Sequence, residues 1–183
     1  MIVDPVSQAV KAMRARLQTR FDKRWSTPIV PVPLSSSEFK RVASMTPFLA
    51  VGLSEVDVSG ARILSGAAHF SIVIGVKNAS NQDNRFLGDA AGPGLYPAMT
   101  IAAALINGHT VPDLCTFTVT RISSAYAEGF SDDAIAVGII NVTTTLSFRD
   151  AIADPDAPDF AGFSAWRDAA GNPQSIIDPA ETV

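Results

Sequence analysis

The chain has 183 residues, of which 47% are hydrophobic and 17% are charged. This composition provides a hydrophobic core for one domain and excludes an intrinsically disordered protein. No apolar run approaches the ~20 residues that cross a bilayer, the first residues lack the apolar core of a signal peptide, and the single cysteine, Cys115, excludes an internal disulfide. These features predict a cytoplasmic origin.

The charge is distributed unevenly along the chain. Residues 1–149 carry 13 Lys and Arg against 11 Asp and Glu, a net charge of +2, whereas residues 150–183 carry one arginine against seven acids, a net charge of −6. We therefore predict an α+β domain over 1–149 and an acidic, proline-containing C-terminal arm over 150–183. Residues 150–159 are typical of a linker. After them Phe160, Phe163 and Trp166 recur at intervals of three, enough for one or two amphipathic turns.

The first element is a predicted helix that begins at Pro5 with Asp4 as its N-cap. One face of this helix is apolar, with residues spaced by four, three, four and four: Val6, Val10, Met13, Leu17 and Phe21. The other faces carry six cations: Lys11, Arg14, Arg16, Arg20, Lys23 and Arg24. The favoured interpretation is a solvated helix face. The alternative is a surface for an acidic partner such as nucleic acid.

The middle of the chain combines a connector, strands and a second helix. Three prolines in 27–33 predict a connector or a sheet edge, and 35–38 either caps a short helical turn or is loop. Residues 47–53 predict a buried strand, 56–58 a half-exposed one and 63–77 a long one, followed by a loop over 78–92 without regular structure. A helix is predicted over 94–107, ended by Gly108. Its apolar stripe comprises Leu95, Ala98, Met99, Ala102, Leu105 and Ile106.

Two further strands complete the predicted domain. In 114–122 apolar residues including Phe117 alternate with threonines, so one side is expected to face water. In 134–148 one face carries Ile135 and Val137 and the other carries Ile140 and Val142. Either a bulge near Gly138 or a second buried surface would explain this pattern. The strands and helices together predict an α+β fold, with an antiparallel β-sheet flanked by helices.

The sequence contains no recognisable arrangement of catalytic residues. His109 and Asp113 could act as a base and its orienting group, but no nucleophile motif accompanies them, so a polar helix terminus is favoured. Two histidines and one cysteine without paired spacing do not form a zinc site, and residues 88–94 lack the Lys-Ser/Thr pair of a phosphate loop. Cys115 is interpreted as an inert core thiol. We therefore predict a protein that is not an enzyme and has no catalytic residue, cofactor or metal.

The order of these elements resembles the tail terminator proteins of Mu-like phages and prophages. The resemblance covers about residues 5–149 and depends on a basic N-terminal helix, the strands PFLAVGLSEVDV and HFSIVIGVKN, the helix GPGLYPAMTIAAALINGH, then FTVTRISS and AIAVGIINVTTTLSF. It implies a structural virion protein that forms a ring, a hexamer in that family, at the head-proximal end of the tail tube. Such a ring stops tube polymerisation and joins the tail to head-completion or connector proteins, and DNA passes through it without sequence-specific binding.

The resemblance provides no interface residues, so we infer them from the sequence. We expect contacts with a neighbouring subunit, the tail tube protein or the head through the first helix, the 78–92 loop and the arm. These candidates are Lys11, Arg14, Arg16, Arg85, Phe86, Leu87, Phe160, Phe163 and Trp166. A head–tail adaptor or a tail tube subunit is the nearest alternative function. A binding module that uses the basic N-terminal helix is an alternative from another class.

Overall fold

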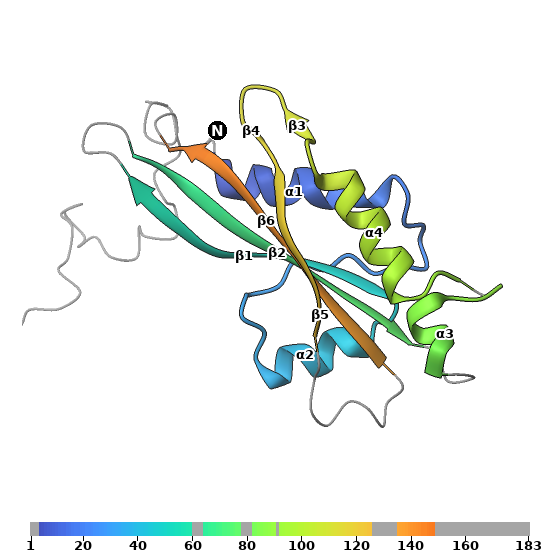
Figure 1. Cartoon of the computed structure of the whole chain (residues 1–183). Coiled ribbons are helices and arrows are strands. Elements are labelled where there is room, and N and C mark those ends of the chain that lie inside the picture. Colours follow the sequence, from blue (N-terminus) through green and yellow to red (C-terminus); the bar gives the residue numbers. More distant parts are fainter. Residues whose placement is uncertain (1–3, 60–63, 78–81, 91, 126–134, 149–183) are drawn as a thin grey trace, which may run out of the picture.

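The computed structural model describes residues 4–59, 64–77, 82–90, 92–125 and 135–148 (Figure 1). The fold is α+β, as predicted, with a four-stranded antiparallel sheet and helices packed on it. The acidic arm, including Phe160, Phe163 and Trp166, lies outside the described residues.

The four long strands lie in the order β1-β2-β6-β5. They span Phe48–Ser59 (β1), Ser65–Lys77 (β2), Thr118–Ala125 (β5) and Ile135–Ser147 (β6), and a two-stranded ribbon is formed by β3 (Thr110–Val111) and β4 (Cys115–Thr116). The β2–β6 register is unbroken, so no bulge occurs at Gly138. The register shifts occur elsewhere, between Leu53 and Glu55 in β1 and between Val119 and Arg121 in β5.

The helices span Pro5–Gln18 (α1), Ser36–Ala43 (α2), Gln82–Leu87 (α3) and Leu95–Ile106 (α4). The predicted cap of α1 is confirmed, because Asp4 Oδ1 accepts hydrogen bonds from the amides of Val6 at 3.0 Å and Ser7 at 3.2 Å. For residues 35–38 the sequence allowed either a capped helical turn or a loop. The structure has a helix there, α2, capped by a 3.2 Å hydrogen bond from the Glu38 amide to Ser35 Oγ. Gly108 has φ 75° after α4, the left-handed conformation expected of a helix stop.

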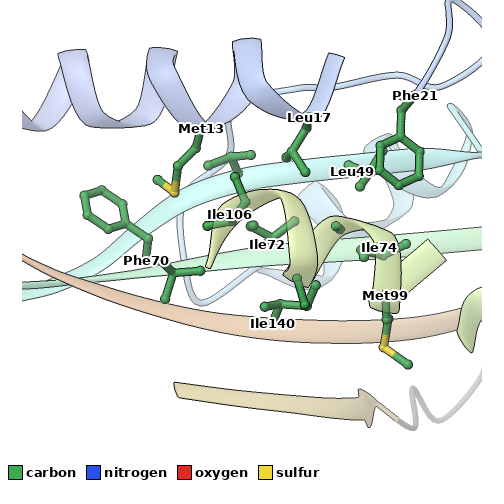
Figure 2. Packing of buried hydrophobic residues seen from close by; sticks show 14 of the residues in the cluster. Met13, Leu17, Phe21, Leu49, Phe70, Ile72, Ile74, Met99, Ile106 and Ile140 are labelled. Carbon is green, nitrogen blue, oxygen red and sulfur yellow. The ribbon is translucent and has the colours of Figure 1, made fainter. Parts of the chain in front are cut away.

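The main core lies between one face of the sheet and the helices α1 and α4. Figure 2 shows Met13 and Leu17 of α1 and Ile106 of α4 pointing toward strand residues such as Ile72. The opposite face of the sheet carries a second, smaller core of Val30, Val42, Phe48, Ala50, Val73 and Val137. The two faces of the 134–148 strand therefore alternate because both are buried, which confirms a second buried surface and rejects a bulge there.

The proline-containing connector lies beside the first half of β1. The Leu49 amide donates to Ser26 O at 2.8 Å, and the Val51 amide donates to Pro28 O at 3.0 Å. These bonds form two parallel bridges, Ser26–Phe48 and Ile29–Val51. Of the two alternatives predicted for this segment, a connector or a sheet edge, both apply: it leads from α1 to α2 and lies along the edge of β1.

One expectation for the 78–92 loop is wrong. We expected about 15 residues without regular structure, but α3 occupies Gln82–Leu87. The Gly88 amide donates to Asn84 O at 2.9 Å, and Gly88 has φ 86°, so this glycine ends a short helical segment without steric cost. The loop is therefore partly helical and presents Arg85, Phe86 and Leu87 from a defined backbone.

Candidate interaction surfaces

One hollow is a groove between the turn that follows α1 and the outer face of α4. We call it the α1–α4 groove. It has a volume of about 500 Å³ and is lined by Arg20, Phe21, Asp22, Arg24, Trp25, Pro93, Ile101, Ala104 and Leu105. Its lining is mainly apolar and aromatic, and its charged groups among the described residues are two cations and one anion from the segment after α1, Arg20, Arg24 and Asp22. Such a site suits an apolar ligand that also carries negative charge.

Local contacts hold both walls of the groove in place. The rings of Phe21 and Trp25 meet edge to face, with centroids 4.9 Å apart and planes at 67°. Arg24 forms an exposed 2.9 Å ion pair with Asp22 in the same turn. From the last turn of α1, Arg16 Nε donates to the carbonyl of Leu105 at 3.2 Å, which joins α1 to the end of α4.

The outer face of α4 is unusual because residues 95–106 contain no charged side chain. A helix that is apolar on all sides is normally covered on all sides. In this domain Tyr96 is 47% exposed and Ile101 is 40% exposed. Leu105, which belongs to the predicted apolar stripe, is only partly buried and lines the groove. Ala103, which lies outside that stripe, is buried.

The three predicted residues of α3 lie beside this face. The ring of Phe86 is 5.4 Å from that of Tyr96 on α4, and Leu87 is 66% exposed, the most exposed of the large apolar residues described. Arg85 is only partly exposed in the same helix. Because α3 and α1 both pack against α4, the apolar surface of α3 and the cations at the end of α1 border one helix.

The three predicted cations of α1 do not form one cluster. Arg14 Nε donates to Thr27 Oγ1 at 3.4 Å, toward the connector, whereas Arg16 reaches α4. Lys11 lines a separate hollow of about 310 Å³ between α1 and the connector, with Val6, Val10, Ile29 and Leu53. We call this hollow the α1–β1 groove. Only Arg16 of the three therefore adjoins the α1–α4 groove.

Half of the second sheet face is polar and has no helix over it in the described part of the chain. Ser54 Oγ lies 3.0 Å from Ser71 Oγ, which in turn lies 3.4 Å from Asn141 Oδ1 across three strands. Further along, His69 Nε2 is 3.1 Å from Asp57 Oδ2. His69 lies within β2, which begins at Ser65. This surface offers hydrogen-bonding groups to a partner.

His109 and Cys115, the residues considered as candidates for catalysis or metal binding, contact neighbouring core residues. His109 stacks on Phe117 at 6.2 Å, and burial, with the nearby charge of Arg16, lowers its pKa. No hydrogen bond to Asp113 is seen in the described part of the chain, and Asp113 has φ 60°. Burial raises the pKa of the Cys115 thiol, although a hydrogen bond with Thr144 opposes this. Among residues whose positions are described, no three His, Cys, Asp or Glu side chains could hold a metal ion, and no helix could cross a membrane.

Comparison with known proteins gives limited similarity. No family model and no curated protein matches the sequence. One chain from a solved structure, the virion of a native gene transfer agent particle, is similar with a TM-score of 0.41 and 13% sequence identity. The match covers 78% of this chain and 97% of that chain. At this TM-score and identity, the similarity assigns no activity or partner to the present protein.

Proposed function

We propose that this chain is a structural protein of a phage-like virion, a tail terminator whose copies close into a ring at the head-proximal end of the tail tube. The observation that carries this proposal is the state of the two sheet edges. On the outer side of β1, the connector pairs only as far as Val51, and in the described residues nothing pairs with Leu53–Ser59. On the outer side of β5, no described strand pairs with Thr118–Ala125.

Unpaired edges favour pairing with another chain. An edge at each side of one sheet allows β5 of one copy to meet β1 of the next. Such a heterologous contact forms a ring when the rotation between successive copies closes, and an open filament when it does not. The charges on one sheet face support this pairing. Arg121 of β5 is the register partner of Asn141, and Glu55 of β1 is the partner of His69. Asn141 is paired with Ser71 of β2, and Ser71 and His69 are two residues apart, so Arg121 and Glu55 lie on the same face of the sheet. In the proposed pairing, Arg121 of one copy would therefore lie near Glu55 of the next.

In this proposal the protein acts by assembly and not by catalysis. The ring would stop growth of the tail tube protein at its head-proximal end and present a surface to a head-completion or connector protein, while DNA passes through without sequence-specific contacts. The exposed Leu87 and the adjoining residues of α3 are our candidates for the contact with tube or head. A hexamer is the expected stoichiometry, and the virion is the expected location.

The same edges would also suit a head–tail adaptor or a tail tube subunit, so the test must separate these roles. Purified full-length protein is examined by sedimentation velocity and negative-stain microscopy, alone and with the tube protein from the same virion. A terminator gives single rings and caps one end of each tube, which shortens the tubes as its concentration rises. Stacked rings would indicate a tube subunit, and a chain that remains monomeric under both conditions would reject the proposal.

A further inference from the structure

We propose that the α1–α4 groove binds the aromatic segment Phe160–Trp166 from the acidic arm of an adjacent copy. The inference rests on the proposed function in one respect only, because it needs a second copy beside the first. It assigns an occupant to a surface that the isolated domain leaves uncovered. Four observations lead to it: the groove lining, the composition of the segment, the charges on both sides and the reach of the chain.

The groove requires an apolar occupant. Ile101 is 40% exposed on a helix that contains no charged residue, and it lies beside Leu105, Phe21 and Trp25 in one hollow. Aromatic side chains have the shape and the area to fill such a site, and they prefer edge contacts with other rings. The pair of Phe21 and Trp25 already has this geometry, with centroids 4.9 Å apart.

The charges around the groove favour an acidic occupant. Arg20, Asp22 and Arg24 line it, and Arg16 contacts the end of α4 next to it, so three cations face one anion. The sequence around Phe160, Phe163 and Trp166 has the opposite balance. Its one cation is Arg167, and its four anions are Asp154, Asp156, Asp159 and Asp168. The arm thus combines apolar rings with negative charge, which is the chemistry that this groove requires.

The reach of the chain favours an adjacent copy as the source of the segment. Phe148 follows the last residue of β6, whose 13 residues extend about 40 Å. The groove lies toward the other end of the sheet, because Trp25 and Pro93 also line a hollow with Val76 and Lys77, and Lys77 is paired with the first residue of β6. Residues 149–159 span at most about 40 Å when fully extended. In the same chain they would have to run straight back along the sheet.

The α1–β1 groove is the competing site. It is also apolar, and Ile29 within it is 50% exposed, but among the described residues that line it the only charged one is Lys11. Binding of the arm to the α1–β1 groove is therefore treated as a separate outcome of the test. Met45, which is 37% exposed at the end of α2, provides a control position of exposure similar to that of Ile101.

The test is chemical cross-linking between two full-length chains that each carry one cysteine. In a Cys115→Ser background, one chain carries Phe163→Cys and the other, tagged, carries Ile101→Cys, and the two are co-expressed so that they mix before assembly. A short bismaleimide is then added. We expect cross-linked tagged–untagged dimers at several-fold higher yield than when Met45→Cys or Ile29→Cys replaces Ile101→Cys. Arg20→Gln with Arg24→Gln should lower this yield several-fold, and Lys23→Gln should not.

The outcomes separate this inference from the proposed function. In one outcome, the protein forms rings by sedimentation while Ile101→Cys gives no more cross-linked dimer than Met45→Cys. That result would overturn the inference and leave the proposed function standing. A higher yield of cross-linked dimer with Ile29→Cys than with Ile101→Cys would do the same. A chain with both Ile101→Cys and Phe163→Cys that gives only an internally linked monomer would place the arm on its own domain, which also overturns the inference. Unmodified protein that remains monomeric alone and with tube protein would overturn both.

Discussion

The ring of Phe48 occupies the space in which a β-carbon on Gly75, its cross-strand partner, would lie. Phe48 belongs to the smaller core beneath α2, where it is fully buried, and Gly75 is buried next to it on β2. The absence of a side chain at Gly75 therefore lets a large ring lie directly on the neighbouring strand. In the described residues, α2 and the connector pack on this part of the sheet face.

Gly75→Ala should destabilise the domain by about 1–3 kcal/mol, because the added methyl group overlaps a ring that is enclosed by the core. Urea unfolding followed by circular dichroism measures the change in free energy. Gly138→Ala should cost less, since the added group meets mainly the flexible Met99 side chain. Gly92→Ala is the matched control, because nothing lies within 4 Å of its added atom. Equal losses at all three positions would contradict the packing argument.

The N-cap of α1 makes a second, independent contribution to stability. Asp4→Ala removes the acceptor for the amides of Val6 and Ser7 and should cost about 1 kcal/mol, whereas Asp4→Asn should retain most of the cap. Burial alone would raise the pKa of Asp4, but the hydrogen bonds from Ser7 and Val6 and the charge of Lys11 together lower it. The stabilisation is therefore present above the ordinary value of 3.8 and lost as the pH falls below it. Unfolding curves of wild type and Asp4→Ala at pH 7 and pH 3 should converge at the lower pH.

His109 should make the domain less stable in mild acid. Burial, and then the charge of Arg16, lowers its pKa below the ordinary 6.5, so the folded state prefers the neutral ring. The unfolded chain therefore binds the proton first, and stability falls as the pH decreases below about 6.5. His109→Phe keeps a ring against Phe117 and should remove this part of the pH dependence. NMR titration of the imidazole provides a direct check, and a pKa at or above 6.5 would contradict the argument.

The sequence predicted those parts of the fold that depend on local pattern, such as the Asp4 cap, the stop at Gly108 and the alternation around Phe117. It failed where packing from other elements decides. Ala103 is buried and Leu105 is only partly buried. Which side of α4 is covered depends on where α1 and the sheet pack against it, and the periodicity of one helix does not give that. Of the candidate site residues, Arg16 was brought to the α4 surface and Arg14 was directed away from it. Neither contact could be read from positions on a single helix.

The surface that the sequence reasoning missed did carry a signal. Residues 95–106 contain no charged side chain, which is unusual for a helix that is assumed to be half solvated. The predicted stripe accounts for one side of this helix and leaves the contacts of its remaining face unassigned. The exposed Ile101 and Tyr96 follow from that composition. In contrast, the edges that no described strand pairs with, Leu53–Ser59 of β1 and β5, could be found only from the strand order, which pattern alone does not provide.

The exposed edge of β5 leads to the last prediction, which concerns assembly. Ile122 is 49% exposed on this edge, so Ile122→Lys should change the stability of the folded chain by no more than about 0.5 kcal/mol. A lysine on an edge strand opposes pairing with another strand, because its charge would have to be buried against the incoming chain. We therefore expect the variant to keep its circular dichroism spectrum and thermal midpoint but to form fewer rings by sedimentation velocity. Met45→Lys, at an exposed position in the turn that follows α2 and outside β5, should assemble normally. Full ring formation by Ile122→Lys would show that β5 lies outside the subunit contact, and the pairing of β5 with β1 of the next copy would then be wrong.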